Sequence, residues 1–223
     1  MSLLVVSLAP VLIIALYVYF RDKYEKEPIR LLLLSLFIGF VITIPIVLLE
    51  NAIKLPDHYV IPVSASVAYD AFIVAAFIEE GMKWLALYWL IWRNKNFNEK
   101  FDGIVYAVFI SLGFAMAENL LYVYDGGMQT GLLRAFTAVP FHAIAGVMMG
   151  YFMALAKFDA GWKGWHIFKS FMVPFVFHGL YDFFIMLGIP WVLLIWFMMM
   201  IGLWIDVFKK MKRISLDSPF RPE

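Results

Sequence analysis

Ionisable side chains occur in the middle of apolar stretches of this sequence. The segment FIEEGMKWLALYWLIW, residues 77–92, holds Glu79, Glu80 and Lys83 among residues that are otherwise almost all apolar. A charged side chain at the centre of a membrane span costs about 2.5–3.5 kcal/mol on insertion scales, so such residues usually face a protein interior and mark a functional site. Two adjacent carboxylates in a dry cavity are suited to activating water by general base catalysis.

Further polar residues interrupt three later apolar stretches of the chain. These are Glu118, Asn119, His142, His178 and Asp182. Residues three or four apart share one face of a helix, so Lys83 can neutralise either Glu79 or Glu80 and leave the other carboxylate free for chemistry. By the same spacing, Asp182 can orient the imidazole of His178 or fix its tautomer.

Carboxylates and imidazoles in this pattern suit several functions. They can hydrolyse a bond with water alone, or they can hold a divalent metal such as zinc through histidine nitrogens and carboxylate oxygens. Neither H-E-x-x-H nor G-x-S-x-G occurs, so the residues do not choose between metal-free and metal-bound hydrolysis. A proton- or ion-coupled transporter would use a similar relay, although we find no inverted repeat. A non-enzymatic membrane adaptor is a further alternative.

These residues belong to a chain with the composition of a polytopic membrane protein. Of its 223 residues, 64% are hydrophobic, and the mean hydropathy is +0.83. A soluble domain is usually about 45–50% apolar. Runs of about 20 apolar residues predict membrane-spanning helices. We therefore expect an all-α transmembrane bundle of about seven spans, with a range of six to eight: 3–20, 31–50, 62–92, 103–124, 132–156, 169–187 and 189–208.

Some segments depart from a plain span. The third is too long for a straight crossing, so its beginning, PVSASVAYDAF, is expected to be interfacial or tilted. The N-terminal apolar run is interpreted as a retained first span, because its positive charges follow the run instead of preceding it. The chain has no cysteine, which excludes disulfides and thiolate metal sites. Its net charge of +1 gives no indication of nucleic-acid binding.

The basic residues predict an orientation in the membrane. Fifteen of the 18 lysines and arginines fall in 21–30, 93–100, 157–169 and the tail from Lys209, whereas the opposite loops, 51–61 and 125–134, carry only Lys54 and Arg134. The positive-inside rule then puts the N-terminus outside and the C-terminus in the cytoplasm. We expect a transmembrane domain over residues 1–208 and a basic cytoplasmic tail over 209–223.

The polar residues are expected to lie at similar depth. At 1.5 Å of rise per residue, Glu79, Glu118, His142, His178 and Asp182 lie about 14–22 Å from the cytoplasmic ends of their spans, within a hydrocarbon core of about 30 Å. Gly146, one turn after His142, leaves room for a neighbouring helix. The sequence therefore predicts one shared pocket at or just outside the midplane.

Four short motifs, in order, resemble one known family. EEGMK (79–83) matches E-E-x-x-K, FAMAE (114–118) matches F-x-x-x-E, HAIAG (142–146) matches H-x-x-x-G and HGLYD (178–182) matches H-x-x-x-D. These are motifs of the PrsW family of intramembrane proteases, which are related to the CAAX-processing and bacteriocin-immunity membrane proteases. The early RDKYEKEP loop, the stretch FDGIVYAVFISLGFAMAEN and the chain length are similar as well, so the resemblance covers essentially the entire chain.

The resemblance implies a protease of regulated intramembrane proteolysis in a bacterial cell membrane. Members of the family make the first, site-1 cut in the extracytoplasmic part of a membrane-anchored anti-sigma factor, which leads to release of a sigma factor in the response to envelope stress. The partner would then be a single-span membrane protein. The family has been grouped with metallopeptidases, and its CAAX-processing relatives have been argued to act without metal, so both mechanisms stay open.

The motifs also suggest a role for each residue. We expect the catalytic residues to be Glu79, Glu80, His142 and His178, with one glutamate as general base on the attacking water. The supporting residues would be Lys83, Glu118, Asn119 and Asp182. If a metal such as zinc is bound, the candidate ligands are Glu80, Glu118, His142 and His178.

Overall fold

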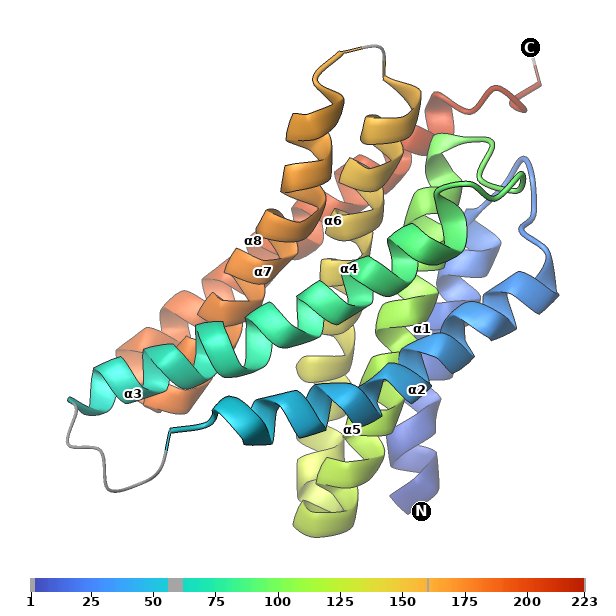
Figure 1. The fold of residues 1–223 in the computed structure, drawn as a ribbon. Helices are drawn as coiled ribbons and strands as arrows, with labels where there is room; N and C mark the ends of the chain where they lie inside the picture. Colours follow the sequence, from blue (N-terminus) through green and yellow to red (C-terminus); the bar gives the residue numbers. More distant parts are fainter. Residues whose placement is uncertain (1–2, 56–61, 160, 223) are drawn as a thin grey trace.

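The computed structural model describes residues 3–55, 62–159 and 161–222, and all of its regular structure is helical (Figure 1). This confirms the predicted all-α class. The elements are α1 (Leu3–Arg21), α2 (Ile29–Ile53), α3 (Val63–Tyr69), η1 (Asp70–Phe77), α4 (Ile78–Ile91), α5 (Lys100–Phe136), α6 (Ala138–Phe158), α7 (Lys163–Leu187) and α8 (Pro190–Leu216).

The helices correspond to the predicted spans. Five stretches among the described residues are long and apolar enough to cross a membrane, and one of them, Lys100–Phe158, contains both α5 and α6. The third predicted span corresponds to the continuous helical run α3–η1–α4. This run is not among the five stretches that are long and apolar enough to cross a membrane. The outward faces of α1, α2 and α8 expose many large apolar side chains, as lipid-facing helices do. Helix α8 continues to Leu216, beyond the predicted end of the last span at 208.

Helices α5 and α6 form the centre of the bundle. Almost every residue of α5 from Phe101 to Ala117 is buried, and so is most of α6. The two helices approach closely because glycines face each other: a Cβ on Gly150 would lie 2.1 Å from the carbonyl oxygen of Gly103. A Cβ on Gly146 would lie 2.9 Å from the Cα of Val108, which confirms the predicted role of Gly146 in making room for a neighbour.

The run α3–η1–α4 crosses the front of the bundle obliquely (Figure 1). Its middle part, η1, is a π-helix of 8 residues, and α4 begins at the next residue and carries Glu79 and Glu80 in its first turn. Aromatic rings hold η1 against α7, with Phe72 and Phe175 at 6.2 Å and Phe77 and Phe171 at 5.6 Å between ring centroids. The π segment therefore fixes the direction in which the two glutamates point.

The connection predicted at 125–134 lies where the chain changes direction, but its residues are helical on both sides of Gly127. Helix α5 continues to Phe136, with one break at Gly127, whose φ is 70° and ψ is −161°. Such a conformation is open mainly to glycine. The chain changes direction there, and Arg134 thereby returns to contact Asn119, 15 residues earlier in the same element.

The basic loops meet at one end of the bundle, where the α1–α2 loop docks on the start of α5. Asp22, Glu27, Glu99 and Asp102 are all buried there, and the Tyr106 hydroxyl donates a hydrogen bond to Glu27. Burial raises the pKa of Asp22 and of Glu27 to about 7, and the Asp22 shift is reinforced by the nearby negative charge of Glu99. Both carboxyl groups therefore prefer to be protonated while the loop is docked.

This preference predicts that docking of the α1–α2 loop weakens as the pH rises. The pKa of Glu27 rises from an ordinary 4.5 to about 7 on docking, so its contribution is complete below about pH 4.5 and is lost as the pH rises through about 7. Hydrogen-exchange protection of residues 22–28, corrected for intrinsic rates, should fall as the pH rises from 5 through 7. Glu27→Gln should flatten this change, whereas the exposed control Lys23→Gln should not. An unchanged profile in Glu27→Gln would contradict the assignment.

Candidate active site

The ammonium group of Lys83 lies at the centre of the polar cluster. Its Nζ is 3.0 Å from Oε2 of Glu79, 2.9 Å from Oε1 of Glu80 and 3.3 Å from Nδ1 of His142. The face of the Phe114 ring lies against the same Nζ, 3.9 Å from the ring centroid. Lys83 thus contacts both carboxylates, where the spacing alone indicated that it could neutralise one of them.

His178 lies on α7 and contacts α4. Its Nδ1 is 2.8 Å from Oε1 of Glu80, and its Nε2 is 3.3 Å from Oδ2 of Asp182 and 3.9 Å from Oε2 of Glu79. Asp182 is one turn along the same helix, as the spacing predicted. Both ring nitrogens therefore face carboxylates, which hold the imidazole in a single orientation.

His142 lies on α6 and is held from the other side by α5. Its Nε2 is 2.9 Å from Oε2 of Glu118, and that same oxygen is 2.8 Å from Nη2 of Arg134. The Arg134 Nε donates to Oδ1 of Asn119 at 3.1 Å, and its guanidinium stacks on the Tyr122 ring. A chain of contacts thus leads from Arg134 through Glu118 to the imidazole.

The polar groups line or adjoin a cavity of about 480 Å³. Glu79, Glu118, His142, His178 and Asp182 line it, whereas Glu80 and Lys83 lie deeper, with no exposed surface. The remaining lining residues come from the second half of α2, from Ala75 of η1, from α5 between Phe114 and Arg134, from Thr137 and Ala138, and from the last turns of α7. The cavity therefore lies toward the end of the bundle opposite the basic loops.

The structure brings together nearly all the residues singled out in the sequence. Seven of them converge around this cavity: Glu79, Glu80, Lys83, Glu118, His142, His178 and Asp182. Asn119 is apart from the others, because its side chain is buried between the backbone carbonyl of Ser7 on α1 and the Arg134 guanidinium. It supports the geometry of Arg134 and does not reach the cavity lining.

Two further charged residues belong to the site. Glu50, at the end of α2, lines the cavity, and Arg134 also lines it. Arg134 carried a signal in the sequence, since it is one of only two basic residues in the loops predicted to be external. Its contact with Glu118 depends on the change of direction at Gly127, which no periodicity indicates.

Four donor groups lie close enough together to hold a divalent metal, which would compete with the ammonium group of Lys83 for three of them. One ligand atom from each of Glu79, Glu80, His142 and His178 lies within 4.8 Å of the other three, in the part of the chain that the structure describes. Two imidazole nitrogens and two carboxylate oxygens are a ligand set that zinc commonly takes. Oε2 of Glu80 is buried without a hydrogen-bond partner and is available for such a bond. Glu118 lies outside this group of four, on the far side of the His142 ring.

The sequence matches one protein family and several named relatives over nearly its whole length. Residues 27–205 match the model of the PrsW family intramembrane metalloproteases. Proteins named Protease PrsW are 35% identical in Oceanobacillus iheyensis, over 96% of this chain and 97% of theirs, and 33% identical in Bacillus subtilis, over 93% of both chains. The protein of that name from Geobacillus kaustophilus is 33% identical over 95% of this chain and 92% of its own.

No solved structure matches the chain. The match to the family model covers most of the sequence and includes all four motif segments. The residue pattern alone was compatible with a protease, a transporter or an adaptor, and the family match selects the protease. This multi-pass membrane protein therefore belongs to the PrsW family of intramembrane metalloproteases.

Proposed function

We propose that the protein makes the first, site-1 cut in the extracytoplasmic part of a membrane-anchored anti-sigma factor and thereby starts sigma-factor release under envelope stress. The observation that carries this proposal is the buried group of Glu79, Glu80, His142 and His178 beside a cavity at the end of the bundle away from the basic loops. A site at that depth suits cleavage next to the membrane surface, outside the cytoplasm.

The proposed orientation follows from the charges at the two ends. The loops around Glu25, Asn98, Lys100 and Asp159 lie together, through a hydrogen bond from Asn98 to Glu25 and an ion pair of 2.8 Å between Lys100 and Asp159. Lys157 also donates to the carbonyl of Phe97 at 2.7 Å. This basic end would face the cytoplasm, together with the C-terminus. Digestion of a C-terminal tag in right-side-out vesicles would overturn the orientation.

The positions of the two glutamates favour different roles. Glu79 lines the cavity, so its carboxylate is placed to take a proton from water that attacks the scissile carbonyl carbon, and later to give that proton to the leaving amine. Glu80 lies deeper and contacts both Lys83 and His178, so it is better suited to holding these two side chains in position. His178 and His142 face the same space and would stabilise the oxyanion or bind metal.

A metal would be held by Glu80, His142 and His178, which leaves Glu79 as the base and one coordination position open. A divalent metal bound there would supply Lewis-acid polarisation of the scissile carbonyl. Lys83 contacts the same carboxylates, so it balances their negative charge and keeps them facing inward. Asp182 and Glu118 fix the orientation of the two imidazoles from outside the donor group.

Replacing either glutamate should stop cleavage. Glu79→Gln removes the proposed base, and Glu80→Gln removes a charge that Lys83 and His178 share, so we expect a loss of about 10²–10⁴-fold in rate for each. The measurement is cleavage of the host's membrane-anchored anti-sigma factors in proteoliposomes. Asp206→Asn, on the exposed face of α8, is the control and should cleave at the wild-type rate. Near wild-type rates for both Gln variants would disprove these roles.

Removal of metal should also stop cleavage. Treatment with a strong chelator is expected to abolish activity, and added zinc should restore it, because Glu80, His142 and His178 offer the three ligands of a catalytic zinc ion. Metal analysis of the purified protein should show about one zinc per chain, less in Glu80→Gln and the same in Asp206→Asn. Full activity in protein stripped of metal would instead support hydrolysis by glutamate and histidine alone.

Arg134 is expected to act through Glu118. Arg134→Met removes the cation that holds Glu118 against His142, so we expect a loss of about 10–100-fold in kcat/KM. Arg134→Lys should lose less, since it keeps the charge but not the simultaneous contacts to Glu118 and Asn119. Exposed Arg93→Met is the control.

The coupling between Arg134 and Glu118 can be measured with a double mutant. If Arg134 acts through Glu118, adding Arg134→Met to Glu118→Gln should cost little more than Glu118→Gln alone. Losses that multiply would show that Arg134 acts elsewhere. Thermal unfolding of each variant identifies losses that come from instability.

A further inference from the structure

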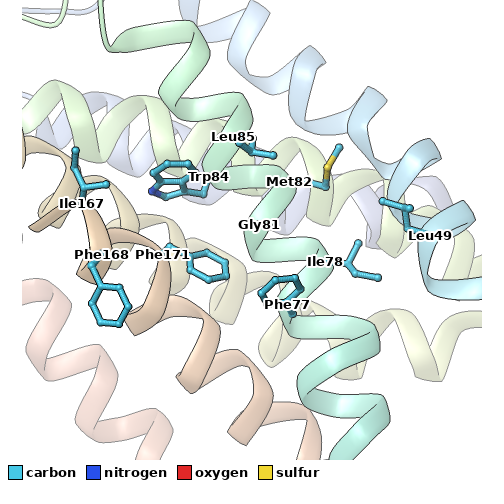
Figure 2. A pocket seen from close by; sticks show the side chains of 10 residues that line it. All are labelled: Leu49, Phe77, Ile78, Gly81, Met82, Trp84, Leu85, Ile167, Phe168 and Phe171. Atoms are coloured by element: carbon cyan, nitrogen blue, oxygen red, sulfur yellow. The ribbon is translucent and has the colours of Figure 1, made fainter. Parts of the chain in front are cut away.

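An apolar groove lies on the membrane-facing side of the helix that carries the two glutamates (Figure 2). It has a volume of about 490 Å³ and lies between α4 and α7, with one edge on α2. Its lining is Leu49, Phe77, Ile78, Gly81, Met82, Trp84, Leu85, Ile167, Phe168 and Phe171. No charged side chain lines it, so its occupant must present an apolar surface.

The floor of the groove is open because Gly81 carries no side chain. A Cβ on Gly81 would meet only the edge of the Phe171 ring, at 3.8 Å. Beside this opening, η1 contacts α7 through the Phe77 and Phe171 rings, and α4 contacts α7 through a 2.7 Å hydrogen bond from Trp84 Nε1 to Ser170 Oγ. The groove is thus a built hollow, fixed by contacts of η1 and α4 with α7.

The groove adjoins the catalytic cavity. On α2, Leu49 lines the groove and the next residue, Glu50, lines the cavity. At the start of α4, Ile78 lines the groove and Glu79 lines the cavity. From that junction the groove follows the helix from Ile78 to Leu85, roughly 10 Å toward the basic end of the bundle at 1.5 Å per residue.

We propose that this groove holds the transmembrane helix of the substrate while the chain just beyond that helix enters the cavity. The proposal rests on the proposed function, in which the cut falls in the extracytoplasmic segment next to a single span. A span whose outer end reaches the cavity must continue below it, toward the cytoplasm, and the groove runs in that direction along α4. Bulky aliphatic side chains of one face of a helix would fill the hollow over Gly81.

Two other apolar grooves on the described surface serve as controls for binding of a helix to any apolar groove. They have volumes of about 220 and 370 Å³ and lie along α1. Ile13 of α1 and Trp204 of α8 line both of them. Neither is lined by α2, η1, α4 or α7, so neither borders the glutamates. A helix bound for cleavage should therefore occupy the groove over Gly81 and not those along α1.

Photo-crosslinking tests the occupant without requiring cleavage. A benzoylphenylalanine is placed at Leu85, or at Ile13 as the control, in full-length Glu79→Gln protein in nanodiscs. Both positions are exposed to similar extents, 56% and 66%. The probe is a single-span peptide with a Leu/Ala core of about 20 residues. We expect the yield of peptide adducts at Leu85 to be at least about fivefold higher than at Ile13. The exposed area of the two positions alone would give similar yields. Equal yields, or lipid adducts alone from Leu85, would overturn the proposal.

A graded series at Gly81 tests the consequence for cleavage. Gly81→Ala should change little, because its Cβ makes ordinary contact, whereas Gly81→Leu should raise KM for a full-span anti-sigma factor about tenfold with kcat nearly unchanged. A peptide that covers the cleavage site but lacks the span should be cut as by wild type. Gly202→Leu, the same change in open space on α8, is the control.

The outcomes separate the two proposals. An unchanged KM in Gly81→Leu with active enzyme would overturn the groove and leave the protease assignment intact. Failure of the wild-type protein to cut any anti-sigma factor would overturn the proposed substrate, and the crosslinking result would still decide the groove. Equal losses on the span-free peptide would indicate that Gly81→Leu displaces Glu80, and would count against the groove.

Discussion

The ammonium group of Lys83 is the charge on which the arrangement of the site depends. It lies among helices whose interior excludes water, where two adjacent carboxylates would otherwise repel each other at high cost. Its contacts with Glu79, Glu80 and His142 hold α4 and α6 in one register. Removing one partner of a buried pair commonly costs about 3–5 kcal/mol, because the remaining charge is left uncompensated. The pocket is therefore held together by the same groups that we propose as catalytic.

The helix packing supplies what the charges alone cannot. Glycines let α5 and α6 approach until their backbones touch, and this contact brings Glu118 within reach of His142. Aromatic contacts between η1 and α7 bring His178 against Glu80. Small residues at helix contacts are a common solution in membranes, where lipid provides no hydrophobic force between helices. The polar groups converge because the apolar parts of the helices first determine their distances.

Much of the fold and most of the polar cluster followed from the sequence for physical reasons. A span must be apolar over about 20 residues, and a charge within it must face inward, so Glu118, His142 and His178 could be identified without coordinates. The contacts of Arg134 could not, because they depend on one positive φ at Gly127 inside a segment that had been assigned to a loop. Nor did spacing show that Lys83 would contact both carboxylates, since this depends on side-chain rotamers.

The π-helix η1 determines how α4 is rotated about its own axis relative to α3. Each residue of an α-helix is rotated by about 100° from the one before it. The direction of every side chain in α4 therefore depends on the turns of η1 that precede it and pack on α7. A π turn takes up one residue more than an α turn does. If the same number of residues in Asp70–Phe77 formed α turns instead, both glutamates would be rotated by about 100° about the axis of α4 without a change in any side chain of the site. The hydrogen-bond pattern of this short segment, and not only the side chains of the motifs, therefore determines where the two carboxylates point.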